Sequence, residues 1–371
     1  MKVLIGGDTV PTESNISLFQ CEDITQLIGI DLHSVIQKHD YFVLNIETPL
    51  ICEDTPIQKS GPVLGVNQSA INGYKKMQVN AVSLANNHIY DHGSTGLRNT
   101  IEVLDRNSIF HFGAGLAYEE MTKCHFAIIG DVKLGFYSCC ENEFSTLTPR
   151  HGGANAYDAL ETFDHIRKLS KECDHLIVLY HGGKEEYRYP TPLQQRIMRK
   201  MADCGARLVV AQHSHCIGCK EEYHGTTLVY GQGNFIFDES TNSCWDNGLL
   251  LSIEIDNSCV DVHFIPVVRK NGCIRIASTE EADAILEDFH RRSEEIMTEG
   301  FVEKSFAQKA LSQKSYLLRK MHGDTAFTKV LSKLFPNYLN KFCYNGKKRN
   351  AALNLVRCES HRETLETILK S

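Results

Sequence analysis

Several features that mark large classes of protein are missing from this chain. No run approaches the roughly 20 consecutive apolar residues of a membrane-spanning helix, so we expect no integral membrane segment. There is no internal repeat, and a composition of 42% hydrophobic and 23% charged residues excludes a disordered, collagenous or coiled-coil chain. Positive charge is not in excess either, since the formal charge is −7, and we expect no nucleic acid as the main partner.

The composition also bears on the compartment and on metals. The apolar run in the N-terminal MKVLIGGDTV is too short for the hydrophobic region of a signal peptide, which favours a cytoplasmic protein. Fourteen cysteines in such a protein predict reduced thiols rather than a disulfide framework. The 17 histidines are numerous for this length. They are compatible with metal binding, although surface histidines are the simpler explanation.

Charge is unevenly distributed along the 371 residues. From Lys304 to Arg357 there are twelve Lys and Arg residues and one acidic residue, Asp324, a local charge of +11. We expect a first domain at 1–278 and a helical, basic region at 279–371. The basic region fits solvated helix faces, or a surface that binds an anionic polymer, a membrane surface or a partner. We expect its helices to pack on the first domain near the mouth of a site for an anionic substrate.

The first 240 residues alternate short apolar runs with amphipathic segments, which predicts an α/β fold. The continuous apolar character of the runs is typical of strands buried on both faces. The predicted strands are Val3–Gly7, Tyr41–Ile46, Ala81–Ala85, His125–Ile129, Lys133–Ser138, His175–Tyr180, Arg207–Ala211 and Thr227–Tyr230. The predicted helices are Ile24–His39, Ser69–Met77, Ser94–Asn107, Ala156–Glu172 and Pro192–Cys204. A β-hairpin is predicted from Gly248 to Val268.

Polar side chains follow five of the predicted strands. They are Asp8, then Asn45 and Glu47, then Asn86, Asn87, His88 and Asp91, then His181, then His213 and His215. Open α/β sheets bind ligands outside the carboxyl ends of their strands, so these groups are expected to converge in one crevice. Carboxylate, amide oxygen and imidazole together are ligands for a divalent transition metal. A Cys216–Cys219 pair offers an alternative zinc site, but no second pair accompanies it.

The order of these segments resembles the CapA family of capsule and poly-γ-glutamate synthesis proteins, within the calcineurin-like metallophosphoesterase superfamily. The segments that carry the resemblance are GDT at 7–9, NIETPL at 45–50, ANNHIYDHG at 85–93, YHGG at 180–183, QHSH at 212–215 and YGQGNFIFD at 230–238. The resemblance implies a four-layer α-β-β-α sandwich with a two-metal phosphoesterase site.

It also implies roles for individual residues. The implied metal ligands are Asp8, Glu47, Asn87, His181, His213 and His215, for two divalent ions such as Mn²⁺, Fe²⁺ or Zn²⁺. His88 is the implied proton donor to the leaving group, with Asp91 either orienting it or capping the following helix. Apart from the resemblance, the substrate-binding candidates are Asn45 and Asn86 at the strand ends and Glu186 and Tyr187 on the loop after His181, for which solvated loop charge is the equal alternative. Val10 stands where the superfamily's first motif has a His, so Thr9, Gln212 or water would have to complete that metal site.

Two functions remain open at this point. The first is a metal-dependent phosphoesterase that hydrolyses an anionic phosphorylated or polymeric substrate in capsule or envelope metabolism. The second is a non-catalytic assembly factor for polymer synthesis or export that uses the same fold for binding. His88 favours the first, and Val10 favours the second. The sequence indicates no oligomeric state.

Overall fold

The structure is a computed structural model that describes residues 1–146, 152–238, 240, 242–256, 259–270, 272–321, 325–335 and 346–369. The chain divides into two compact units, residues 1–303 and 304–371. Helix α9 (Thr279–Glu295), which the sequence analysis assigned to the C-terminal region, lies within the first unit. Among the described residues, no helix combines the length and the apolar composition that crossing a bilayer requires.

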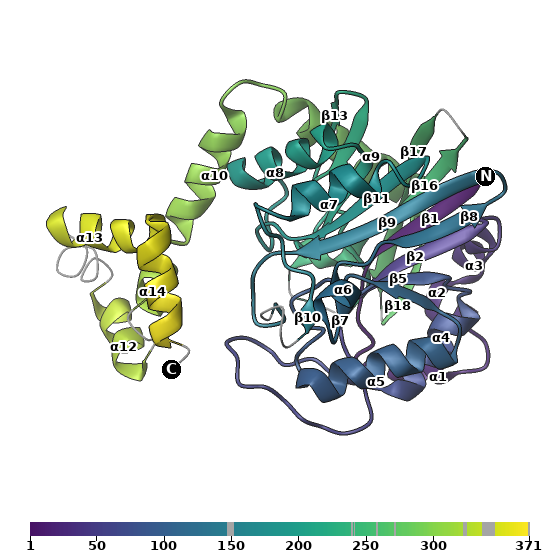
Figure 1. Cartoon of the computed structure of the whole chain (residues 1–371), viewed down its shortest axis with the longest axis horizontal. Coiled ribbons are helices and arrows are strands. Elements are labelled where there is room, and N and C mark those ends of the chain that lie inside the picture. The colour runs from purple at the N-terminus through teal and green to yellow at the C-terminus, as the bar shows by residue number, and fades with distance from the viewer. Residues whose placement is uncertain are drawn as a thin grey trace. The chain divides into compact units, whose positions relative to one another are not determined.

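Two β-sheets form the centre of the first unit (Figure 1). The larger sheet has the order β18 (Cys273–Ile276), β17 (Val260–Lys270), β16 (Asn247–Ile255), β1 (Lys2–Thr9), β2 (Tyr41–Ile46), β5 (Ala81–Ser83) and β6 (Phe110–Phe112), with β15 (Asn234–Ile236) also paired to β1. The smaller sheet has the order β13 (Lys220–Tyr223), β14 (Thr226–Val229), β12 (Ala206–Gln212), β11 (His175–His181), β9 (Val132–Cys140) and β8 (His125–Ile129). The strands that carry the candidate site residues, β1, β2 and β5 in one sheet and β11 and β12 in the other, run parallel to one another within each sheet.

Helices cover the outer face of each sheet. Against the larger sheet lie α1 (Ile16–Gln20), α2 (Thr25–Ile28), α3 (Ile30–Ile36), α4 (Ile71–Lys76) and α5 (Gly93–Arg106). Against the smaller sheet lie α7 (Thr162–Leu169) and α8 (Pro192–Asp203). The short elements of the unit include α6 (Tyr118–Met121), β3 (Leu50–Ile51), β4 (Val66–Asn67), β7 (Ala114–Gly115) and β10 (Gly153–Ala154).

The hydrophobic core is divided in the same way. One buried cluster joins the larger sheet to its helices, with Leu44 and Leu104 as members. A second lies between the two sheets, where Ile5 of β1 and Leu179 of β11 belong to the same cluster. A third joins the smaller sheet to α7 and α8. Because strands buried on both faces need apolar side chains on both, this packing explains their uninterrupted hydrophobic runs. The four-layer α-β-β-α sandwich predicted from the sequence is confirmed.

Local signals account for some element boundaries and for one of two differences from prediction. Helix α8 begins with a capping box. The Thr191 hydroxyl accepts a hydrogen bond from the Gln194 backbone N–H, and the Gln194 side-chain oxygen accepts one from the Thr191 backbone N–H. The helix predicted at 24–39 is broken into α2 and α3 at Gly29, whose φ of 68° is left-handed. The helix predicted at 156–172 is confined to α7. The predicted hairpin corresponds to β16 and β17, which pair antiparallel.

The register of the strands brings their polar ends together. Asp8 of β1 lies opposite Asn45 of β2, and His181 of β11 lies opposite Gln212 of β12. A side chain at Gly7 would approach the Gly233 carbonyl oxygen to 2.2 Å, so glycine is required where β1 passes β15. The carboxyl ends of the central strands therefore supply one shared edge for a site.

The second unit is helical in its described part. It contains the end of α10 (Phe301–Ser312), then α11 (Lys314–Lys320), α12 (Ala326–Leu334), α13 (Gly346–Arg357) and α14 (Glu359–Leu369). Within it, α11 contacts α12 and α13 contacts α14.

Candidate metal centre

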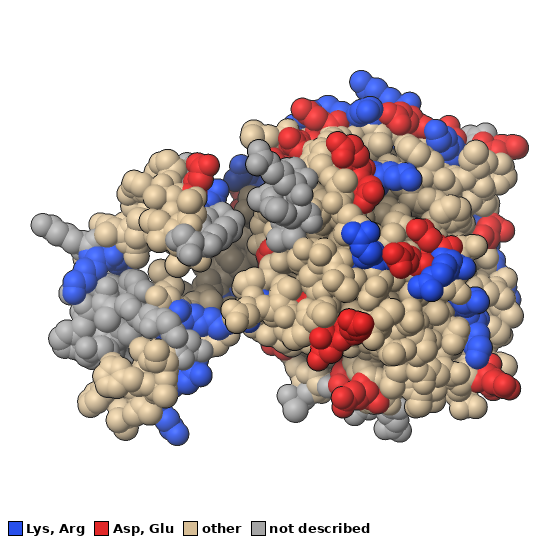
Figure 2. All heavy atoms as spheres, turned by 60° about the horizontal axis from the view of Figure 1, so that its bottom comes forward, with Lys and Arg blue, Asp and Glu red and all other residues tan. Residues whose placement is uncertain are grey.

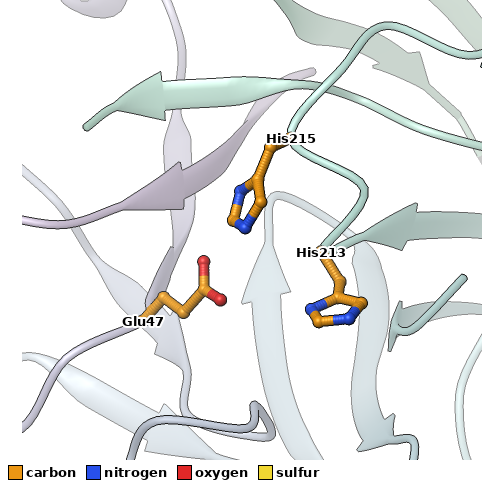
Figure 3. Close-up of side chains that lie close together, drawn as sticks. All are labelled: Glu47, His213 and His215. Atoms are coloured by element: carbon orange, nitrogen blue, oxygen red, sulfur yellow. The ribbon is translucent and has the colours of Figure 1, made fainter. Parts of the chain in front are cut away.

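Three buried side chains at the carboxyl ends of the strands point toward one another (Figure 3). They are Glu47, directly after β2, and His213 and His215, on the turn that follows β12. One carboxylate oxygen and one ring nitrogen from each histidine lie within 4.8 Å of one another. In the described part of the chain this is the one group of His, Cys, Asp and Glu side chains close enough to share an ion. It forms the centre of the candidate site.

Asp8, Asn45 and His181 lie beside this group. The Asp8 carboxylate accepts hydrogen bonds from the Asn45 amide at 2.7 Å and from the His213 backbone N–H at 2.9 Å. His181 Nε2 lies 3.2 Å from Glu47 Oε1 and 3.0 Å from Asn87 Oδ1. All six predicted metal ligands are therefore in one buried cluster, drawn from both sheets.

Backbone conformation aims the two histidines. His213 and His215 have φ values of 91° and 55°, the left-handed region that residues with bulky side chains seldom adopt. Such conformations cost free energy and persist where the surroundings impose them, often at functional sites. This unusual backbone conformation lets the two imidazoles, which are two residues apart in the sequence, face the same point.

Asn234 on β15 orients one of these rings. Its Oδ1 lies 2.9 Å from Nδ1 of His215, which leaves Nε2 of that ring for another partner. Side chains that fix a metal-binding histidine in this way typically tune metal affinity.

Unsatisfied atoms show that the cluster suits a cation. Both carboxylate oxygens of Glu47 and Nδ1 of His213 are buried and have no hydrogen-bond partner, since the His181 Nε2 near Glu47 is engaged with Asn87 Oδ1. Buried groups left unpaired cost free energy, and a bound divalent ion would remove that cost. The donor set of carboxylate oxygen, amide oxygen and imidazole nitrogen fits Mn²⁺, Fe²⁺ or Zn²⁺.

The protonation states also suit metal binding. Burial alone would raise the pKa of Glu47, but the neighbouring His181, His215 and His88 outweigh it and lower the pKa to about 2. Burial, followed by the nearby His181, holds the pKa of His213 well below its ordinary value. Glu47 and His213 are thus in the anionic and neutral forms that ligate metals at neutral pH. Burial and the nearby Glu47 instead raise the pKa of Asp8, and although burial alone would lower the pKa of His181, the neighbouring Glu47 raises it.

His88 contacts Asp91 and also Lys59, a lysine that the sequence motifs did not indicate. Nδ1 of His88 lies 2.6 Å from Asp91 Oδ2, and the other Asp91 oxygen accepts from Lys59 Nζ at 2.6 Å. The Lys59 side chain is 3% exposed, and its Nζ also lies 3.3 Å from His88 Nδ1. Helix α5 has His92 at its N-cap, without a side-chain cap, so Asp91 does not cap this helix and its carboxylate contacts His88 instead.

The predicted substrate-binding residues fall into two places. Asn45 and Asn86 are fully buried, and their amide nitrogens donate to Asp8 and to the Ile46 carbonyl. Glu186 is exposed, and Tyr187 is buried, on the loop that follows β11. The Glu186 backbone N–H donates to the carbonyl of Ser214, which ties this loop to the His213–His215 turn. Their role toward substrate stays a prediction.

Two more residues at the site were missed. Glu143 lies 3.5 Å from the Asn87 amide nitrogen and 3.9 Å from His213 Nε2, and its side chain is 38% exposed. Trp245 stacks on His215 with a centroid separation of 4.2 Å. Trp245 lies on a connecting segment, where the strand-end pattern could not find it. Glu143 follows shortly after the end of β9, so that pattern could have included it.

The position of the missing histidine is apolar. Val10 is 2% exposed and provides no donor. The Thr9 hydroxyl donates to the Gly7 carbonyl, and the Gln212 amide donates to the Gly6 carbonyl and to Gln232. These hydrogen bonds use the donor groups of the two side chains, so the oxygens of Thr9 and Gln212, together with water, remain the candidate ligands.

Trp245 provides a direct measure of ligand binding, because it is the sole tryptophan in the sequence. Since its ring stacks on His215, Mn²⁺ bound at the centre is expected to quench its fluorescence in a saturable way. Titration of metal-free protein with Mn²⁺ measures this, and a chelator should reverse it. Trp245→Phe should abolish the signal while elemental analysis still finds metal. An unchanged emission at full metal occupancy would contradict the stacking.

Lys59→Met is expected to destabilise the protein by about 3 kcal/mol, because it leaves the buried Asp91 carboxylate without its cation. The loss falls at the lower end of the range for buried pairs, since the Leu64 N–H still donates to Asp91. Denaturant unfolding measures it. The control is Lys2→Met, which breaks a half-exposed pair with Glu254 and should change the free energy of unfolding far less. Equal losses for the two variants would contradict the prediction.

The chain belongs to the bacterial capsule synthesis protein family PGA_cap, whose model matches residues 2–239. It is 26% identical over 239 residues to the PGA biosynthesis protein CapA of Bacillus subtilis, covering 62% of this chain and 63% of that protein. It is 24% identical over 247 residues to the capsule biosynthesis protein CapA of Bacillus anthracis, covering 64% and 60%. The chain therefore spans less than two thirds of the length of these relatives.

Solved structures with a similar arrangement include two from other bacteria. A phosphatase from Mycoplasma pneumoniae has a TM-score of 0.46 and 12% identity, over 76% of this chain and 96% of that one. A 5'-nucleotidase precursor from Thermus thermophilus has a TM-score of 0.42 and 12% identity, over 78% and 58%. The family resemblance drawn from the sequence motifs is confirmed by the match to the family model.

Proposed function

We propose that the protein is a metal-dependent hydrolase of the phosphoesterase type, acting on an anionic phosphorylated substrate in capsule or envelope polymer metabolism. The observation that carries the proposal is the His88–Asp91 pair at the edge of the metal-ligand cluster. A purely structural metal site has no use for an imidazole held by a carboxylate beside it. The proposed compartment is the cytoplasm, which suits the many buried cysteine thiols.

Two divalent ions would be held by Asp8, Glu47, Asn87, His181, His213 and His215. When bound, such ions lower the pKa of water and stabilise charge on phosphoryl oxygens. The chain's own part is to hold the ligands: Asn45 fixes Asp8, and Asn234 fixes His215. Asp91 accepts from Nδ1 of His88, so that Nε2 of that ring would carry the proton for the leaving oxygen.

The alternative is a binding module for polymer assembly. It is favoured by one observation, the buried Val10 where the superfamily has a metal-binding histidine. A site with one weakly held ion would bind an anionic polymer without hydrolysing it.

One experiment separates the two functions. Purified protein is analysed for bound metal and then screened for release of phosphate from alkyl and aryl phosphates with Mn²⁺, Fe²⁺ or Zn²⁺. The proposed hydrolase should contain metal and turn over at least one substrate. Metal-loaded protein that hydrolyses none of them, yet binds a polyanion such as poly-glutamate, would support the binding module.

A further inference from the structure

Helix α12 in the second unit is amphipathic, with an apolar face flanked by a basic one. Phe327, Val330 and Leu334 recur at spacings of three and four, which places them on one face. They are 73%, 57% and 66% exposed. Lys333 lies at the flank of this face and Lys329, four residues earlier, lies further round the helix, and both are exposed. A soluble helix normally buries its apolar face against its own protein. In the described part of the chain this face is exposed instead, which is typical of a surface that binds a partner.

The neighbouring helix α11 has the same two kinds of side chain. Tyr316 and Leu317 are each 45% exposed. The Arg319 guanidinium and the Lys320 ammonium lie 5.5 and 5.1 Å from the centroid of the Tyr316 ring. Tyrosine beside cationic side chains is typical of surfaces that lie at a membrane–water interface. Helix α11 contacts α12, so the two helices are neighbours in the second unit.

Charge complementarity identifies the partner. Residues 304–357 carry a charge of +11, and Figure 2 shows Lys and Arg side chains (blue) beside uncharged surface (tan) on the helices of the second unit. Lysines alone would suffice for an anionic polymer, which offers nothing to Phe327 or Leu334. An anionic bilayer offers both a negative surface and an apolar phase beneath it.

We propose that α11 and α12 bind the surface of an anionic lipid bilayer, with the Phe327–Leu334 face inserted and the lysines at the headgroups. This goes beyond the proposed hydrolytic function and does not depend on it. The basic region would thereby hold the first unit near membrane-associated substrate.

The test is sedimentation of the full chain with vesicles. It uses vesicles of phosphatidylcholine alone and of phosphatidylcholine mixed with phosphatidylglycerol, at about 0.1 M and about 1 M salt. The parent should pellet with the anionic vesicles, and less so at high salt. Lys329→Gln with Lys333→Gln should weaken binding roughly 25-fold, because each basic residue near such a surface contributes roughly fivefold.

The apolar face is tested separately. Phe327→Ser with Leu334→Ser should weaken vesicle binding roughly 100-fold, since two apolar side chains are no longer inserted. The matched control is Ile128→Ser with Leu160→Ser, which removes two apolar side chains of the first unit that are 77% and 83% exposed. This variant should bind vesicles as tightly as the parent. Circular dichroism of each variant confirms that helix content is kept.

Three outcomes would overturn the proposal. One is a parent that does not pellet with anionic vesicles at low salt. Another is a Phe327→Ser, Leu334→Ser variant that binds vesicles as tightly as the parent. The last is a parent that binds soluble poly-glutamate through the lysines alone and ignores vesicles, which would assign the surface to an anionic polymer.

Discussion

His88→Ala is expected to keep its full metal content while losing about 10²–10⁴-fold in turnover of an alkyl phosphate. His88 does not belong to the group of Glu47, His213 and His215, so that group survives its removal. An alkoxide leaving group needs a proton, and the ring held by Asp91 is the group in place to give it. Steady-state rates and elemental analysis of the same preparations measure the two effects.

The choice of substrate makes this prediction specific. An aryl phosphate with an acidic phenol leaves as a stable anion, so its hydrolysis should fall much less in His88→Ala. The corresponding control is Asp91→Asn, which keeps the shape of the side chain but weakens its hydrogen bond to His88. It should lower turnover less than His88→Ala does, and again more for the alkyl phosphate than for the aryl phosphate. A metal-loaded His88→Ala protein that hydrolyses the alkyl phosphate at the parental rate would remove His88 from the mechanism.

Glu47→Gln is expected to have the largest effect, lowering metal affinity by more than about 100-fold and turnover of both substrates to background. Residues that only orient a metal ligand typically contribute about 10–100-fold to metal affinity. Glu47 is expected to contribute more, because it supplies the negative charge itself. Its two oxygens are buried, and the polar group nearest to them is the ring of His181, itself a candidate ligand, at 3.2 Å. Isothermal titration with Mn²⁺ and elemental analysis measure the loss.

His213→Ala should behave like Glu47→Gln and affect alkyl and aryl phosphates alike. The matched control is His175→Ala, which removes another buried histidine, at the opposite end of β11, where its ring meets the Asp256 carbonyl. That variant should keep its metal even where it loses stability. Full metal occupancy in either Glu47→Gln or His213→Ala would contradict the ligand assignment.

Much of the first unit could be predicted because its signals are local. The run at 41–46 coincides with β2 residue for residue, and the run at 175–180 ends one residue before β11 does. These strands are buried along nearly their whole length, so the apolar run ends close to where the strand ends. Edge elements such as β13 and β18 carry mixed side chains and were missed, since their pairing depends on neighbours distant in the chain.

The α/β class and most of the strands follow from local pattern, which also collected the polar residues at or just after the ends of the apolar runs. The choice of six ligands among those residues came from the family resemblance. That pattern could not place Lys59, which reaches Asp91 from a loop 32 residues earlier, or Trp245, which stacks on His215 from a later connecting segment. The Lys59 contact exists because β2 and β5 are neighbours in one sheet, which brings the loops after them together. The Trp245 contact exists because the two sheets pack face to face, which brings the segments after β12 and before β16 to one edge. The local sequence pattern shows which residues stand at the end of a strand. Only long-range packing determines which side chains from different loops meet at that end of the sheets.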